Sequence, residues 1–123
     1  MGIEKIDKKY FLNEFSKEVF NLSSKEYQKR VWIDGLGPEC DDFSESINRF
    51  FDSCEIVLNY FEEFGLKKEQ YFLLSSFSKE FERFIQTNKN PPQEFIDTPE
   101  WTKITERAKE VLKAFHWKTP DQD

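Results

Sequence analysis

The chain has 123 residues, with 24 acidic and 18 basic side chains and a formal net charge of −6. This length fits one domain and excludes a two-domain enzyme, a (β/α)₈ barrel and a full dinucleotide-binding fold. Leu, Ile, Val and Phe make up 34 of the residues, and Phe alone accounts for 14. We therefore expect a packed core built from large aromatic side chains and not a disordered chain.

The first two helices are predicted from apolar spacing and from capping residues. The first is expected over residues 7–21, with Asp7 as its N-cap. The second is expected to begin at an S-x-x-E capping box formed by Ser23 and Glu26. It should stop at the segment 34–38, where two glycines and a proline favour a tight loop.

Three further helices follow in the same way. The third is expected to begin at Asp41 or Asp42 and to end at Gly65, a typical left-handed C-cap. The fourth should end before the segment 88–92, which contains two adjacent prolines. The fifth is expected to begin at Thr98, which is followed by a proline at the first helical position.

These elements predict an all-α fold: a single-domain bundle of about five amphipathic helices with an aromatic-rich core. The domain is expected over residues 1–118, followed by a polar C-terminal tail over residues 119–123. No run of 18 apolar residues and no secretory signal are found, so we expect a cytoplasmic protein. Cys40 and Cys54 are then expected to be reduced thiols, with one of them in the core.

Negative charge is concentrated in one part of the chain. The segment 34–63 has nine acidic residues and one basic residue, Arg49, so it carries −8 while the rest of the chain carries +2. Helical spacing places five residues of this segment on one solvent-facing line, opposite the aromatic stripe. Together with the preceding loop, the candidate partner-binding residues are Glu39, Asp41, Asp42, Glu45, Asp52, Ile56, Asn59 and Glu63.

The line of carboxylates has two interpretations. It is either an ordinary solvated helix face or a surface that binds a positively charged partner, with Ile56, Trp32 and Tyr60 as candidate apolar anchors. Trp32 is also compatible with a place in the core, and Trp101 is expected there. The strong segregation of charge favours the partner-binding interpretation.

The sequence contains no motif for catalysis, for a metal or for a cofactor, and we expect none of the three. The single histidine, His116, cannot form a histidine-based metal site, and we expect it to interact with the end of the last helix. Direct nucleic-acid binding is disfavoured, because the best basic stripe consists of only Lys25, Lys29 and Arg30. We also expect neither a membrane partner nor a small-molecule substrate.

Two segments resemble a known class of protein. Residues 31–43 read VWIDGLGPECDDF, and residues 94–101 read EFIDTPEW, followed by AKEVLKAF over residues 108–115. This pattern, over about the last 90 residues, resembles small bacterial immunity proteins encoded beside contact-dependent growth-inhibition toxins. The resemblance implies a small cytoplasmic toxin inhibitor that acts by protein–protein interaction on one cognate toxin, commonly a basic nuclease domain.

Two alternative functions remain open from the sequence. The first is an acidic regulatory or adaptor module that inhibits or docks another basic protein by nucleic-acid mimicry. The second is an enzyme with a pair of carboxylates, since acidic residues are abundant. A toxin gene directly upstream would favour immunity over the first alternative, whereas activity without a protein partner would favour the second.

Overall fold

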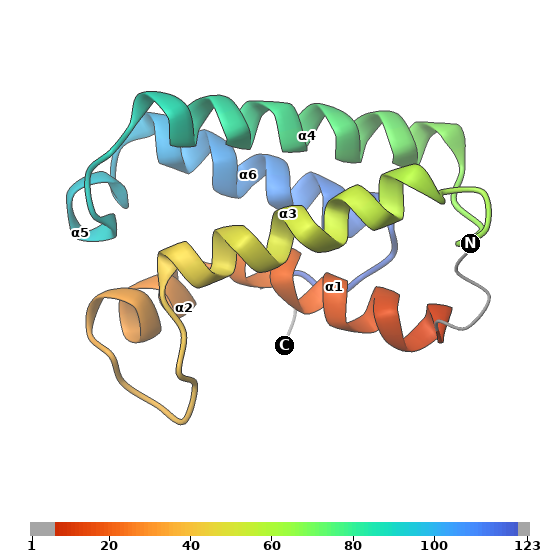
Figure 1. Cartoon of the computed structure of the whole chain (residues 1–123). Coiled ribbons are helices and arrows are strands. Elements are labelled where there is room, and N and C mark those ends of the chain that lie inside the picture. Colours follow the sequence, from red (N-terminus) through yellow and green to blue (C-terminus); the bar gives the residue numbers. More distant parts are fainter. Residues whose placement is uncertain (1–6, 121–123) are drawn as a thin grey trace.

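The computed structural model describes residues 7–120, and Figure 1 shows their arrangement. Four long helices form a bundle in which α6 packs against α1 and α4, and α3 packs against the same two helices. Three short elements complete it, of which η1 is a π-helix, and no strand occurs within the described range. The elements are α1 (Lys8–Ser23), α2 (Lys25–Tyr27), η1 (Gln28–Ile33), α3 (Phe43–Asn59), α4 (Lys68–Thr87), α5 (Pro92–Phe95) and α6 (Pro99–Ala114).

The all-α single-domain bundle is confirmed, and its five expected helices correspond to α1, α2 with η1, α3, α4 and α6. One element was not expected. The four-residue helix α5 begins directly after Pro91, with Pro92 at its first position. Proline suits that position, because its fixed φ and missing N–H cost nothing in the first turn of a helix.

The boundary between α1 and α2 differs from the expected capping box by one residue. Ser23 is the last residue of α1, and its hydroxyl donates to the Phe20 carbonyl oxygen at 2.7 Å. Ser24 is the N-cap of α2 instead, because its hydroxyl accepts from the Tyr27 N–H at 3.1 Å. The Ser23 hydroxyl is bound within the preceding turn, and the predicted box with Glu26 is therefore wrong.

The third helix ends six residues before the predicted position, although Gly65 has the predicted left-handed conformation. The regular part of α3 ends at Asn59, and the chain continues through a turn to Gly65, which has a φ of 76°. The Leu66 N–H donates to the Phe61 carbonyl at 2.9 Å, and the Gly65 N–H donates to the Glu62 carbonyl at 3.0 Å. This pair of bonds is a Schellman motif, which places a left-handed residue at Gly65.

The last helix ends in the same motif without a glycine. The Trp117 N–H donates to the Leu112 carbonyl at 2.8 Å, and the His116 N–H donates to the Lys113 carbonyl at 3.1 Å. His116 has a φ of 59°, a conformation that costs a residue with a Cβ about 1–2 kcal/mol. His116 therefore closes this helix through its backbone N–H, and its side chain is exposed.

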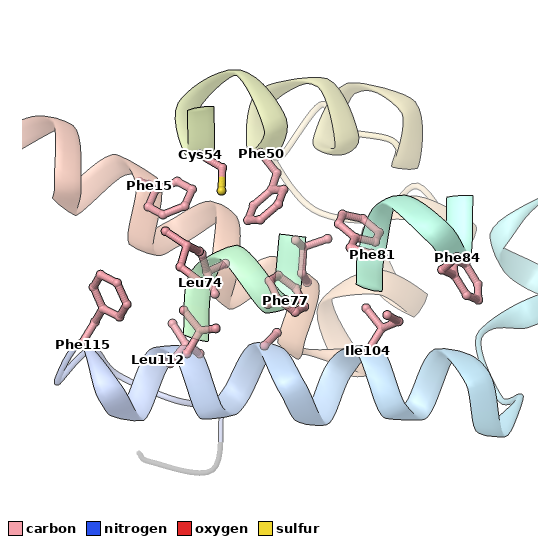
Figure 2. Packing of buried hydrophobic residues seen from close by; sticks show 14 of the residues in the cluster. Phe15, Phe50, Cys54, Leu74, Phe77, Phe81, Phe84, Ile104, Leu112 and Phe115 are labelled. Carbon is pink, nitrogen blue, oxygen red and sulfur yellow. The ribbon is translucent and has the colours of Figure 1, made fainter. Parts of the chain in front are cut away.

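Aromatic side chains dominate the core, as the composition predicts. Figure 2 shows Phe15 of α1 and Phe50 of α3 pointing toward side chains of α4 and α6. The Phe50 ring lies 5.6 Å from that of Phe81 in an edge-to-face arrangement, and the Phe77 and Phe81 rings stack at 6.0 Å. These four rings and Trp101 are at most 1% exposed. Edge-to-face and offset pairs of this kind add stability beyond the area that they bury.

A buried polar pair connects the short helices to the bundle. Gln28 is fully buried, and its side-chain oxygen accepts from the Trp101 indole N–H at 2.8 Å. Its amide nitrogen donates to the carbonyls of Asn21 and Leu22 at 2.9 and 3.0 Å. Because each polar atom of the Gln28 side chain has a partner, its burial carries no large desolvation cost.

The packed domain extends beyond the expected boundary at residue 118. Thr119 is only 2% exposed, and Pro120 is half-buried. The preceding Trp117 packs edge-on against Phe15, with ring centroids 6.0 Å apart. The prediction of a polar tail from residue 119 is therefore wrong at Thr119, while residues 121–123 lie outside the described range.

Candidate functional site

The outer side of α3 carries a series of exposed carboxylates. Glu45, Asp52 and Glu55 are exposed at helical spacing, and Glu62 and Glu63 are exposed in the turn that follows. These five residues are called the acidic face below. Because α3 packs against α1 and α4 and lies across the bundle from α6, this side of the helix is turned away from the core (Figure 1).

The acidic face has no counter-charge from its own helix. Arg49 is the only base in α3, and its guanidinium instead contacts Glu18 of α1 at 3.1 Å and Asp41 at 2.6 Å. Among residues 7–120, no Lys or Arg forms an ion pair with the five carboxylates of the acidic face. Within the described part of the chain, only solvent and salt therefore screen the negative charge of this surface.

A groove extends the negative surface from α3 to α4. It has a volume of about 330 Å³, and its lining includes the apolar side chains of Phe51 and Leu58. Glu55 of the acidic face and Glu82 of α4 both line it, together with Asn59. Glu82 is far from the acidic segment 34–63 in sequence, so the charge of that segment does not predict its presence here.

Asp41 does not belong to this surface, contrary to expectation. Its side chain is only 5% exposed. It accepts hydrogen bonds from Arg49 at 2.6 Å, from the Tyr27 hydroxyl at 2.7 Å and from the Trp32 indole N–H at 3.1 Å. Burial alone would raise the pKa of Asp41, but these bonds outweigh it and hold the pKa below its usual value. Asp41 is thus a structural group that joins η1 to α3, and through Arg49 to Glu18 of α1.

Glu39 is neutralised by the chain itself, which also differs from expectation. Its two oxygens accept from the two terminal nitrogens of Arg30 at 2.8 and 2.9 Å, a bidentate pair. These bonds lower the pKa of Glu39 to about 2. The Arg30 guanidinium also donates to the Leu36 carbonyl at 3.3 Å and lies against Gly37, where a side chain would collide with it. Glu39 therefore closes the loop between η1 and α3.

The remaining predicted residues have mixed positions. Asp42 is exposed and is the N-cap of α3, because its carboxylate accepts from the Glu45 N–H at 2.8 Å. Asn59 is exposed beside the groove. Ile56 and Tyr60 are half-buried and pack against the core. The expectation that Ile56 is an exposed apolar residue among the carboxylates is wrong. Glu55, and not Ile56, belongs to the exposed side of α3.

The groups that could suggest catalysis are dispersed. Cys40 is exposed and Cys54 is buried, both as free thiols, which agrees with the sequence. Burial raises the pKa of the Cys54 thiol to about 12, so it is a poor nucleophile at neutral pH. Within the part of the chain that the structure describes, no three His, Cys, Asp or Glu side chains gather as metal ligands. Nor does any helix there have the length and apolar character needed to cross a bilayer.

No protein-family model matches this chain, and no match was found among the curated proteins or the solved structures. Among the described residues, the acidic face combines exposed carboxylates with the absence of paired bases.

Proposed function

We propose that this chain is an immunity protein that binds and neutralises a cognate toxin domain, a basic nuclease, through the acidic face. The observation that supports it is a row of exposed carboxylates to which no Lys or Arg within residues 7–120 is paired. Asp52 and Glu55 are three residues apart on one helix, a like-charge spacing that destabilises an isolated helix. A partner that carries Lys and Arg would relieve this repulsion on binding.

Charge of this kind acts mainly on the rate of association and on the choice of partner. A nuclease domain keeps a basic surface for the phosphates of its substrate, and the acidic face has the complementary sign. Complementary potentials raise association rates by about 10- to 1,000-fold and disfavour partners of the wrong charge. Inhibition then requires no chemistry, because an inhibitor bound at the basic surface excludes the nucleic acid.

The segments that resemble immunity proteins contribute to the packing of the bundle more than to the proposed interface. Trp32 and Phe43 lie in one segment, Phe95 and Trp101 in the other, and their rings pack together at 4.9–6.3 Å. The acidic face lies outside both segments. We infer that the resemblance concerns how the bundle is held together, whereas the partner is selected by residues that differ from one immunity protein to another.

The proposal predicts that a toxin gene lies directly upstream of this gene, and it is tested with the toxin domain of that gene, purified in a catalytically inactive form. Glu45→Lys combined with Asp52→Lys should leave the helical circular dichroism spectrum unchanged. Association with the toxin domain should slow at least tenfold at low salt, with a smaller difference at high salt. Cells that express the active toxin should also lose protection.

The matched control is Glu94→Lys combined with Glu106→Lys, which changes the net charge equally at exposed positions outside α3. It should bind at nearly the wild-type rate. Equal rates for both double variants would remove the acidic face from the interface. Failure of the wild-type protein to bind the toxin domain would reject the immunity function, and capture of another basic protein in its place would favour the adaptor alternative.

A further inference from the structure

A second concavity lies beside the start of α3, outside the acidic face. It has a volume of about 450 Å³, within the range of about 300–1,000 Å³ that is usual for binding pockets. Its lining includes aromatic and aliphatic side chains from four parts of the chain, namely Trp32, Phe43, Ile47, Ile85, Pro91 and Pro92. We call it the aromatic pocket.

Contacts with neighbouring residues fix the side chains that form the walls of the aromatic pocket. The Trp32 indole N–H is bound by Asp41 at 3.1 Å, which fixes the ring. The Phe43 ring packs against the Trp32 ring at 5.3 Å and against buried Phe95 at 5.0 Å. On the opposite wall, the Asn88 side chain accepts from the Asn90 N–H at 2.9 Å, just before the two prolines. A pocket with fixed walls loses little conformational entropy when it is filled.

The charges at the rim identify the kind of group that fits. Asp42 and Lys89 contribute one negative and one positive group, so the lining has no net charge. Most of the remaining lining is aromatic or aliphatic, and the one polar atom of the Trp32 side chain is already bound by Asp41. A bulky apolar side chain therefore fits this pocket better than a cation does, in contrast to the acidic face beside it.

We propose that the aromatic pocket receives one large apolar side chain of the same basic partner that the acidic face attracts. The inference rests on the proposed function, since the partner is identified by charge complementarity with the acidic face. Continuity supports it: Asp42 and Ser44 line the pocket, and Glu45, the first residue of the acidic face, follows directly in α3. Interfaces of this kind combine a central anchor in a pocket with a charged rim. The pocket then supplies slow dissociation, and the acidic face supplies fast association.

The test is a substitution that fills the pocket without touching the core. Ser44 is exposed and lines the pocket, so Ser44→Tyr should obstruct it while the fold is kept. Dissociation of the inactive toxin domain should become at least tenfold faster, with little change in the association rate. Because the lost contact is apolar, the effect should be the same at about 0.05 and about 0.5 M salt. In the wild-type complex, the indole N–H resonance of Trp32 should shift on binding.

The matched control is Gln86→Tyr, which adds the same side chain at an exposed position of α4 that does not line the pocket. Dissociation of this variant should remain within about twofold of wild type. If Ser44→Tyr dissociates at the same rate as this control, the aromatic pocket is not occupied, while the proposed function stands. An effect that disappears at high salt would mean that a cation fills the pocket and would overturn the proposal. If the toxin domain does not bind the wild-type protein, the proposed function is rejected, and this inference is rejected with it.

Discussion

Asp41 provides the sharpest test of how this bundle is held together. Its nearly buried carboxylate accepts hydrogen bonds from Arg49, Tyr27 and Trp32. Replacement by Ala removes the acceptor, and a buried donor left without a partner costs about 1–3 kcal/mol. Tyr27 and Trp32 are only half-buried, and Arg49 keeps its contact with Glu18, so part of this cost is recovered. We expect Asp41→Ala to lower the free energy of unfolding by about 2–4 kcal/mol.

The measurement is urea unfolding, followed both by far-ultraviolet circular dichroism and by tryptophan fluorescence, so that two-state behaviour is checked. Asp41→Asn should cost less than Asp41→Ala, because its amide oxygen still accepts hydrogen bonds. A double-mutant cycle of Asp41→Ala with Tyr27→Phe should give a coupling free energy of about 1 kcal/mol. Glu39→Ala is the matched control, because it removes a surface ion pair whose two side chains are 37% and 36% exposed, and such pairs contribute little to stability.

The pH dependence of this effect has a definite sign. The pKa of Asp41 is lower in the folded protein than its ordinary value of 3.8. Its stabilisation is therefore complete above that value and is lost as the pH falls through the folded pKa. The difference between wild type and Asp41→Asn should be constant near neutral pH and should shrink below about pH 4. A loss of less than about 0.5 kcal/mol for Asp41→Ala at pH 7 would refute the structural role given to Asp41.

Two further predictions concern single positions. His116→Gly should raise the free energy of unfolding by about 0.5–1 kcal/mol, measured by urea unfolding, because glycine adopts the observed positive φ without strain. A decrease would mean that the His116 side chain makes a stabilising contact. With a thiol reagent at neutral pH, Cys40 should react at once and Cys54 only after unfolding, because burial raises the pKa of Cys54 to about 12. Two fast thiols in the native protein would contradict the burial of Cys54.

The helices could be predicted from sequence because their signals are local. Apolar residues at helical spacing located α1, α3, α4 and α6, and Asp7 and Thr98 cap the first and last of these as expected. Gly65 could be predicted as the end of a Schellman motif, because glycine adopts the required positive φ without strain. The N-cap of α2 could not be predicted to the residue. Ser23 and Ser24 are adjacent and either can cap a helix, so the local sequence does not select between them.

The candidate site was harder to predict, because its composition depends on how helices pack. The helix α3 contacts both α1 and α4, so its buried arc is wide enough to include Ile56, and the exposed line runs through Glu55 instead. Charge alone assigns Asp41 and Glu39 to the partner-binding surface. Their partners Arg49 and Arg30 are eight and nine residues distant, and charge counting does not show which acidic groups such bases neutralise.

The pairing of Arg49 with Glu18 and Asp41 separates two tasks along a single helix. The residues of α3 that fix the fold and those that present charge lie on opposite sides, and the only basic side chain of the helix serves the first group. Substitutions on the outer side can therefore accumulate without loss of folding. A lineage of such bundles could exchange one target for another by changing a handful of codons, and an engineer could graft a new recognition surface onto the same scaffold.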